Sequence, residues 1–196
     1  MFKKGGFLVN LISVLLLVVI ILSFILVTFP LIEKKYIYPL KYEETVVKYS
    51  KEYNLDFYLV MAIIKTESSF RASAVSEKGA KGLMQITDNT AKYIAKELKE
   101  SDFEIFSPET NIKFGCYYLR YLFNTFEVEE TALSAYNAGE GNVLSWLKNS
   151  KYSLDGKNLT TIPFKETNEY VKKVYKSYNK YRKLYKNFVD KTKNFE

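Results

Sequence analysis

The chain of 196 residues contains no histidine, and this absence excludes several classes of catalytic site. Neither a Ser-His-Asp triad nor a Cys-His pair can be built without an imidazole. A zinc site would have to use carboxylates and the single cysteine, Cys116, which together make a poor ligand set. The sequence therefore argues against histidine-based and metal catalysis, and acid–base chemistry is left to Asp, Glu, Lys and Tyr.

Cysteine is almost absent too, so the chain forms no intramolecular disulfide and packing must stabilise the fold. Cys116 lies in a run that is typical of a helix, where a free cysteine is most often a small buried hydrophobe and not a nucleophile. The sequence also lacks a glycine-rich phosphate loop, a metal-ligand cluster, an internal repeat and a recognisable nucleic-acid-binding module. We therefore expect no cofactor and no nucleic-acid partner.

One long apolar run is present near the start of the chain. From Phe7 to Thr28 the sequence has 22 residues without a charge, enough to cross a bilayer core of about 30 Å as a helix. The run is longer than the apolar region of a secretory signal, which favours an uncleaved transmembrane anchor. We expect residues 1–6 before the anchor, the anchor at 7–28, a stem at 29–41 and one globular domain at 42–196. Lysines on both sides of the anchor leave its orientation open.

Positive charge is concentrated at the other end of the chain. Of the net charge of +7, residues 165–196 supply most, because they hold ten Lys or Arg and four Asp or Glu. In a membrane-tethered chain such a region fits anionic lipid head groups or anionic wall polymers, while a solvated helix face is an equally good interpretation.

Glu67 is the strongest candidate for a catalytic group. Val60, Ile63, Glu67 and Phe70 recur at spacings of three and four, which places them on one side of a helix. A carboxyl group on an apolar face is expected to have a raised pKa, as a proton donor near neutral pH requires.

The remaining pattern predicts a mainly α-helical domain. Caps and apolar spacing indicate helices at 57–68, 87–98, 108–124, 129–136, 143–147 and from 163 onward. The small residues of segment 71–82 indicate a loop or a very short hairpin that could form one wall of a cleft.

Four blocks of the sequence resemble the soluble lytic transglycosylase family, and they occur in the family's order. They are Glu67-Ser68-Ser69-Phe70, Gly79 to Ile86, Ala135 to Gly139, and Glu166-Thr167 with Tyr170-Val171. The resemblance extends over roughly residues 42–185. The resemblance implies a lysozyme-like fold, α+β with at most a minimal β-hairpin.

The resemblance also implies an activity: non-hydrolytic cleavage of the MurNAc–GlcNAc bond of peptidoglycan to a 1,6-anhydro product. It makes Glu67 the acid and then the base. It further implies that the sugar sites are lined by Ser76, Met84 and Gln85. Tyr136 would hold the catalytic carboxyl group or the adjacent sugar, Asn137 would contact an amide or help to shape the wall, and Glu166 would contact saccharide. Because peptidoglycan lies outside the membrane, the domain is expected on the extracytoplasmic face, with residues 1–6 in the cytoplasm.

Two alternatives remain open at this stage. A goose-type-lysozyme-like hydrolytic muramidase would need a second carboxylate, and Glu77 and Asp88 are the nearest acids. Glu77 is expected in an exposed loop and Asp88 at a helix cap, so neither is expected to serve catalysis. A noncatalytic peptidoglycan-binding module would keep the cleft without the reaction.

Overall fold

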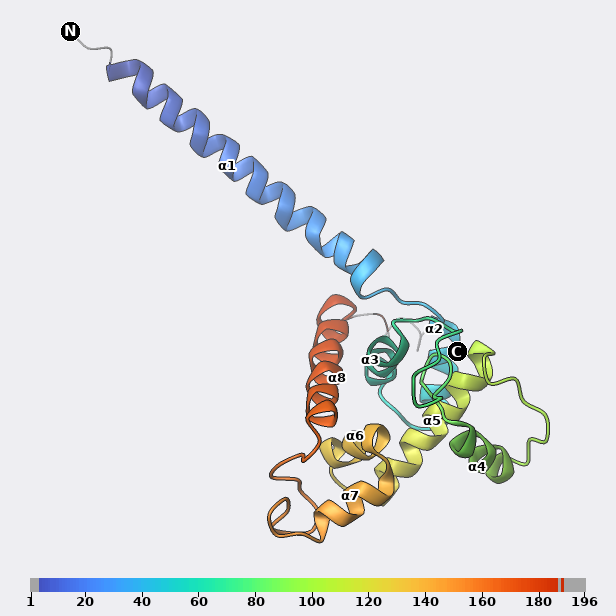
Figure 1. Ribbon diagram of the computed structural model, residues 1–196. Coiled ribbons are helices and arrows are strands. Elements are labelled where there is room, and N and C mark those ends of the chain that lie inside the picture. The colour runs from blue at the N-terminus through green and yellow to red at the C-terminus, as the bar shows by residue number, and fades with distance from the viewer. Residues whose placement is uncertain (1–3, 187, 189–196) are drawn as a thin grey trace. The chain divides into compact units, whose positions relative to one another are not determined.

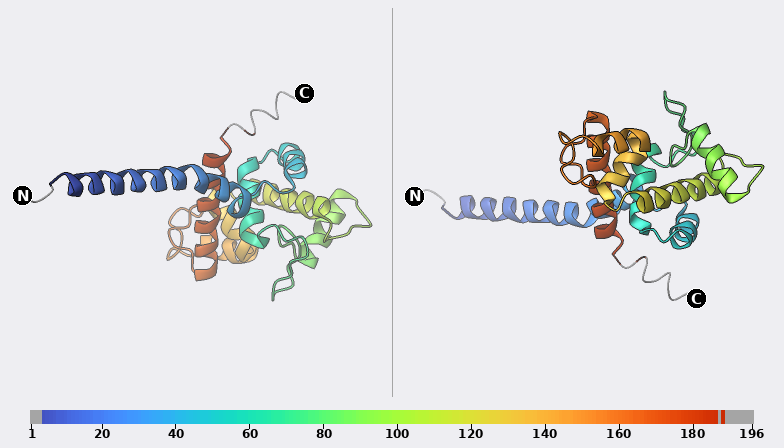
Figure 2. Two further views of the ribbon diagram at one scale, coloured as in Figure 1. Left: turned by 90° about the horizontal axis from the view of Figure 1, so that it is seen from above. Right: turned by 90° about the horizontal axis from the view of Figure 1, so that it is seen from below.

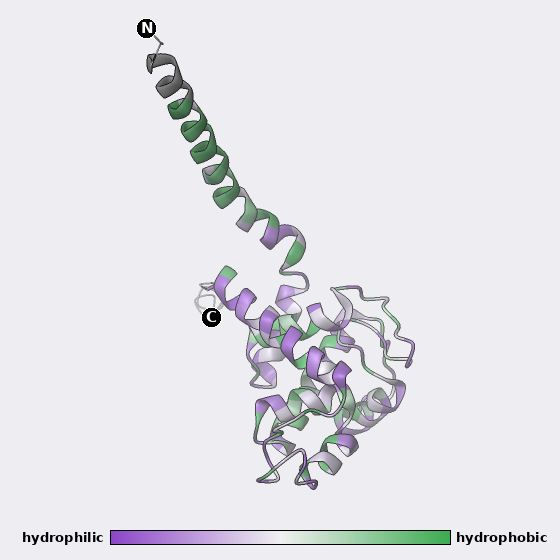
Figure 3. Ribbon diagram, turned by 60° about the vertical axis from the view of Figure 1, so that its left-hand side comes forward, coloured by the Kyte–Doolittle hydropathy of each residue, from purple (hydrophilic) through white to green (hydrophobic). Residues whose placement is uncertain are grey.

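The computed structural model describes residues 4–186 and 188, which fall into two compact units, Met1–Pro39 and Leu40–Glu196. The first unit contains α1 (Lys4–Ile32) and the π-helical turn η1 (Glu33–Ile37). The ribbon of α1 is coloured mostly as hydrophobic (Figure 3), and its large apolar residues from Leu11 to Ile32 are exposed. The stretch Leu11–Ile37 is long and apolar enough to cross a membrane. The segment expected as a stem, 29–41, is thus helical as far as Ile37.

The second unit is built from helices in the described part of the chain. Their bounds are α2 (Glu43–Glu52), α3 (Phe57–Ser68), α4 (Asp88–Leu98), α5 (Pro108–Thr125), α6 (Glu129–Ala138), α7 (Glu140–Leu147) and α8 (Lys165–Leu184). The predicted bounds of α3 agree with the structure at both ends. α6 and α7 are longer than predicted, and they meet at Gly139, whose φ is 89°.

Local capping explains where two of these helices begin. The Asp56 side chain accepts hydrogen bonds from the backbone N–H groups of Tyr58 and Leu59, and the Thr87 hydroxyl accepts one from Thr90. Side-chain acceptors at this position satisfy N–H groups that have no partner inside the helix. The sequence signals at 56 and 87 therefore set the starts of α3 and α4.

The helices of the second unit form a closed ring of packing contacts. α3 packs most extensively against α8, α8 against α6, α6 against α5, α5 against α2 and α2 again against α3 (Figures 1 and 2). α3 is buried along almost its whole length, from Phe57 to Ile64. α4 packs on α5 and α7 on α6. A helix held in this way positions its last turn rigidly, and Glu67 lies in that turn.

The expected hairpin is reduced to a loop. Within the described residues there is no strand, and only the isolated bridges Val75–Lys81 and Lys81–Ile86 occur. The loop closes on itself because the backbone N–H of Gly82 donates to Ala74 and that of Ser76 donates to Ala80. The domain is therefore mainly α, with the 69–87 loop between α3 and α4.

Candidate active site

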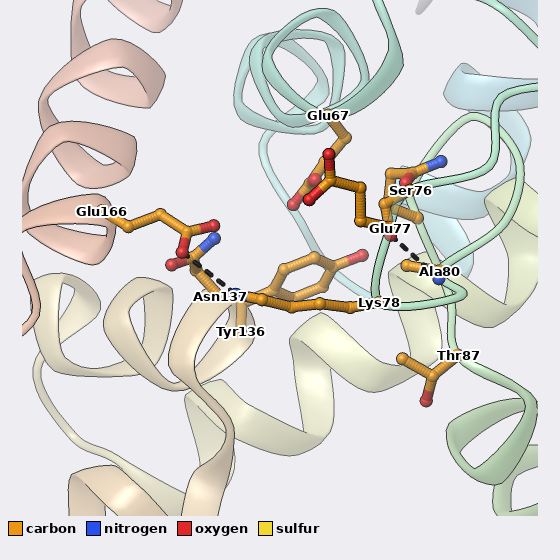
Figure 4. A pocket seen from close by; sticks show the side chains of 10 residues that line it. Glu67, Ser76, Glu77, Lys78, Ala80, Thr87, Tyr136, Asn137 and Glu166 are labelled. Atoms are coloured by element: carbon orange, nitrogen blue, oxygen red, sulfur yellow. Dashed lines mark hydrogen bonds and ion pairs between the residues drawn. The ribbon is translucent and has the colours of Figure 1, made fainter.

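A cavity of about 440 Å³ lies where α3, the 69–87 loop, α6 and α8 meet (Figure 4). Glu67 projects into it from the last turn of α3. The loop, α6 and the first turn of α8 supply the other walls, through Ser76, Glu77, Lys78, Ala80, Gln85, Thr87, Tyr136, Asn137 and Glu166. Three separate stretches of the sequence, namely α3 with the loop that follows it, α6 and α8, thus converge on one carboxyl group.

Glu67 is only partly accessible, and its surroundings raise the pKa of its carboxyl group to about 7. Burial is the main cause, because few water molecules can solvate the ionised form. The Tyr170 hydroxyl acts in the opposite direction and lowers this pKa, while the charge of Glu166 raises it further. A carboxyl group in this state is protonated in a large fraction of molecules at neutral pH, as a general acid requires.

Two tyrosines lie beside Glu67, of which Tyr170 is buried and Tyr136 is partly exposed to the cavity. The Tyr136 hydroxyl donates to the Met84 carbonyl oxygen at 2.9 Å. The Tyr170 hydroxyl interacts with the Glu67 carboxyl, but it meets no partner at full hydrogen-bond geometry in the described part of the chain. Burial, followed by the charge of Glu67, raises the pKa of both hydroxyls well above the ordinary value, so both remain neutral donors.

Buried side chains fix the loop wall to the helical core. Asn111 of α5 accepts a hydrogen bond from the Met84 N–H at 2.7 Å and donates to the carbonyl oxygens of Lys81 and Ile105, both at 2.9 Å. Gly82 lies so close to Asn111 that a Cβ at this glycine would be 2.2 Å from the Asn111 Nδ2. The loop therefore requires glycine at 82 and asparagine at 111.

Ser76 and Gln85 line the cavity and also support the loop. The Ser76 hydroxyl accepts a hydrogen bond from the Ala80 N–H at 3.0 Å. The Gln85 side-chain amide donates to the Gly82 carbonyl oxygen at 2.8 Å, from a residue whose φ is 52°. Both residues thus hold the wall in place and present polar atoms to the cavity.

Asn137 and Glu166 connect the walls of the cavity. The Asn137 Oδ1 accepts a hydrogen bond from the Thr167 hydroxyl at 2.8 Å, which joins α6 to α8. Glu166 forms an ion pair with Lys78 at 3.0 Å, between α8 and the loop. Both partners of this pair are well exposed, so it contributes little to stability.

The structure brings six of the seven predicted site residues to this one cavity, and the exception is Met84. Its side chain is fully buried, and its sulfur packs against Gly115 of α5. The prediction that Met84 lines the sugar sites thus does not match the described lining, because the side chain points into the core. Only its backbone takes part, as the acceptor for Tyr136.

Glu77 is exposed, as expected, and it lines the cavity that contains Glu67. It was not predicted as a site residue, and neither were Lys78, Ala80 and Thr87, although the segment from 71 to 82 was predicted to form a cleft wall. Asp88 begins α4 and pairs with Lys81, outside the described lining.

A second cavity, of about 280 Å³, continues from the first. The two share Gln85, Thr87, Tyr136 and Asn137, and the second extends to Thr90, Tyr118 and Gly139. The site is therefore an elongated groove and not a closed pocket. Cys116 lies elsewhere, fully buried in the core, and burial raises the pKa of its thiol.

Residues 44–159 match the family model described as the transglycosylase SLT domain. The chain belongs to this family. It is 37% identical over 143 residues to the soluble lytic murein transglycosylase of Salmonella typhimurium, covering 70% of this chain and 22% of that protein. It is 36% identical over 124 residues to membrane-bound lytic murein transglycosylase C of Photorhabdus laumondii, covering 57% and 35% of the two chains.

Solved structures of the SLT family show the same fold. An inactive mutant of the lytic transglycosylase Slt from Pseudomonas aeruginosa aligns with a TM-score of 0.65 and 30% identity, over 74% of this chain and 24% of that chain. The Escherichia coli soluble lytic transglycosylase aligns with a TM-score of 0.64 and 33% identity, over the same shares. The predicted family and the mainly α, lysozyme-like fold class are confirmed. The chain spans about a quarter of the length of these relatives.

Proposed function

We propose that this SLT-domain chain is a membrane-anchored lytic transglycosylase that cleaves the MurNAc–GlcNAc bond of peptidoglycan. The observation that carries the proposal is the Glu67 carboxyl group, whose pKa burial raises to about 7 at the edge of an open groove. Such a group can donate a proton and then accept one at the same pH. The names of the relatives, which are lytic murein transglycosylases, support the same reaction.

In the proposed reaction, Glu67 first protonates the glycosidic oxygen, and the bond to C1 of MurNAc breaks. The N-acetyl oxygen of the same sugar attacks C1 and holds the positive charge that develops there. Glu67, now ionised, then removes the proton from the C6 hydroxyl, and O6 displaces the N-acetyl oxygen from C1. The 1,6-anhydro ring closes, no water is consumed, and Glu67 is protonated again.

The two tyrosines suit the change of charge on Glu67. The Tyr170 hydroxyl favours the ionised carboxylate, which forms after the first step, and burial of the site favours the protonated acid before it. The carboxyl group is thus balanced between its two states. Tyr136, held on the Met84 carbonyl, fixes the wall against which the sugar would lie.

The hydrolytic alternative keeps one supporting observation, because Glu77 and Glu166 also line the cavity. A hydrolase needs a second carboxylate as nucleophile or as base for water. We favour the transglycosylase because both of these side chains are exposed and Glu166 is paired with Lys78. The substitution Glu77→Gln tests whether Glu77 is a second catalytic carboxylate. If it is, the variant should cleave peptidoglycan more slowly than the wild type.

The decisive experiment is mass spectrometry of the products from purified peptidoglycan and full-length protein in detergent. We expect anhydro-MurNAc ends from the wild type and from Glu77→Gln, and none from Glu67→Gln. Products with only reducing ends would identify a hydrolytic muramidase. Binding to peptidoglycan without cleavage by the wild type would identify a noncatalytic module.

For the first unit we propose a single membrane span at residues 7–28, with the SLT domain on the extracytoplasmic face. The exposed apolar surface of α1 supports the span, and the location of peptidoglycan supports the orientation. The protein should remain in the membrane fraction after alkaline extraction. Protease added to spheroplasts should digest the domain, and protection of the domain would contradict this orientation.

For α8 we propose weak binding to anionic lipid or wall polymer through its exposed face. Thr167, Tyr170 and Val174 point into the core, while Lys172, Lys176 and other basic residues are exposed. Binding to anionic vesicles should fall as salt rises from 50 to 500 mM, because screening shortens the range of the attraction. Residues 189–196, which complete the basic region, lie outside the described residues.

A further inference from the structure

A row of tyrosine rings leads away from the catalytic cavity along α5. The ring of Tyr118 lies 5.7 Å from that of Tyr136 and 6.1 Å from that of Tyr121, and Tyr121 lies 5.9 Å from Tyr93 of α4. Tyr136 lines the first two cavities, and Tyr118 lines the second and a third. The row therefore connects the surroundings of Glu67 with a more distant site.

We call this third cavity the outer cavity. It has a volume of about 310 Å³ and is lined by Asn89, Thr90, Tyr93, Tyr118, Tyr121 and Glu140. It shares Thr90 and Tyr118 with the second cavity, so the groove continues into it. The Tyr93 side chain is 40% exposed, which leaves its ring accessible to a ligand.

Glu140 gives the outer cavity a negative charge. It is the first residue of α7, and the Tyr121 hydroxyl donates to its carboxylate, with both oxygens at 3.1 Å. Burial raises the pKa of Tyr118 to about 12, and the charge of Glu140 contributes to that increase. In the described part of the chain, no lysine or arginine pairs with Glu140 or lies over the rings of Tyr93, Tyr118 or Tyr121.

An anionic carboxylate among tyrosine rings is suited to an organic cation. Aromatic faces attract an ammonium group through their quadrupole, and a carboxylate binds it by a charge-assisted hydrogen bond. A neutral sugar could stack on the rings, but it would leave the charge of Glu140 without a counterpart. The combination therefore favours a ligand that carries a primary ammonium group.

We propose that the outer cavity is a subsite for a primary ammonium group of the peptidoglycan strand that is cleaved at Glu67. This inference rests on the proposed function, because it takes the strand as the ligand of the groove. Peptidoglycan offers such a group in two places: the free amine of a diamino acid in a stem peptide, and a glucosamine that lacks its acetyl group. N-acetylation makes either one neutral.

The test measures binding, so that it does not depend on cleavage. Full-length Glu67→Gln protein in detergent is titrated with fluorescently labelled, uncross-linked peptidoglycan fragments, either untreated or N-acetylated with acetic anhydride. The same titrations are made after adding Glu140→Gln, which removes the charge and keeps the side-chain size. Glu130→Gln, an exposed carboxylate of α6 outside the three cavities, is the matched control.

We expect N-acetylation to raise the Kd three- to tenfold, and Glu140→Gln to raise the Kd for untreated fragments by the same factor. Protein with Glu140→Gln should no longer distinguish the two substrates, and Glu130→Gln should behave like its parent. The proposal is overturned if Glu140→Gln leaves the Kd unchanged, if acetylation has no effect, if acetylation weakens the Glu140→Gln protein equally, or if the fragments do not bind.

A further comparison identifies the source of the amine. If an amidase first removes the stem peptides, sensitivity to acetylation is lost when the amine belongs to a stem and is kept when it belongs to glucosamine; both results support the subsite. The products of the wild type are analysed separately. If the wild type forms no anhydro ends, the proposed function is overturned. If Glu140→Gln leaves the Kd for the fragments unchanged, only the proposed subsite is overturned.

Discussion

Replacing Glu67 by glutamine should abolish cleavage and at the same time stabilise the fold above neutral pH. Glutamine has the size of the protonated acid but cannot ionise. In the wild type, burial raises the pKa of this carboxyl group from an ordinary 4.5 to about 7. Glutamine cannot ionise in either state, so the variant should gain stability relative to the wild type once the pH exceeds the ordinary pKa of 4.5, above which the wild-type carboxyl ionises in the unfolded chain.

The size and the sign of the effect follow from proton binding. Between pH 4.5 and 7, Glu67 is ionised in the unfolded chain but keeps its proton in the fold, so unfolding releases a proton and rising pH favours it. Each pH unit in this interval lowers the free energy of unfolding by about 1.4 kcal/mol. The difference between variant and wild type should thus be near zero below pH 4.5 and reach about 3 kcal/mol above pH 7.

The measurement is urea unfolding of both full-length proteins in detergent from pH 4 to 8.5, followed by tryptophan fluorescence. Trp146, the single tryptophan, lies largely buried in α7 and reports on the fold. Subtracting the free energy of unfolding of the wild type from that of the variant removes the contributions of the other titrating groups. Glu130→Gln is again the control. A difference that stays constant from pH 4.5 to 7.5, or a variant less stable than the wild type at pH 8, would refute the buried neutral acid.

Three further predictions concern activity and packing. Cleavage of peptidoglycan should fall as pH rises through about 7, because the protonated acid disappears; a pH–rate profile that is flat from pH 6 to 8 would contradict this. Asn111→Ala should lower the free energy of unfolding by about 3 kcal/mol, since three backbone groups lose a buried partner, while Asn124→Ala on the exposed face of α5 should have little effect. Gly115→Ala would place a Cβ 2.2 Å from the Met84 sulfur, so it should lower the free energy of unfolding, measured by thermal unfolding, by about 1–3 kcal/mol. The control Gly141→Ala places its Cβ in open space on α7 and should not destabilise the fold.

The helices could be predicted from the sequence because their signals are local. Asp56, Thr87 and Pro108 mark helix starts at the expected residues. The apolar spacing indicates a helix packed in the core at α3, which is buried on all sides from Phe57 to Ile64. The bounds of α6 and α7 were less accurate, because the chain turns at Gly139 and packing on α6 stabilises a longer α7 than the local signal indicates. Caps act over a few residues, whereas packing acts between distant segments.

The sequence by itself argued against histidine-based and metal catalysis, and its apolar spacing made Glu67 the candidate acid. Only the tertiary structure decided how far the pKa of Glu67 rises, because burial by the packed fold is the main cause. Tyr170, which lowers this pKa, and Glu166, which raises it, are both about one hundred residues away in the chain. It also placed the side chain of Met84 in the core and brought Glu77 to the cavity. These outcomes depend on which way a loop side chain faces, and that is fixed by contacts between segments that no local pattern encodes.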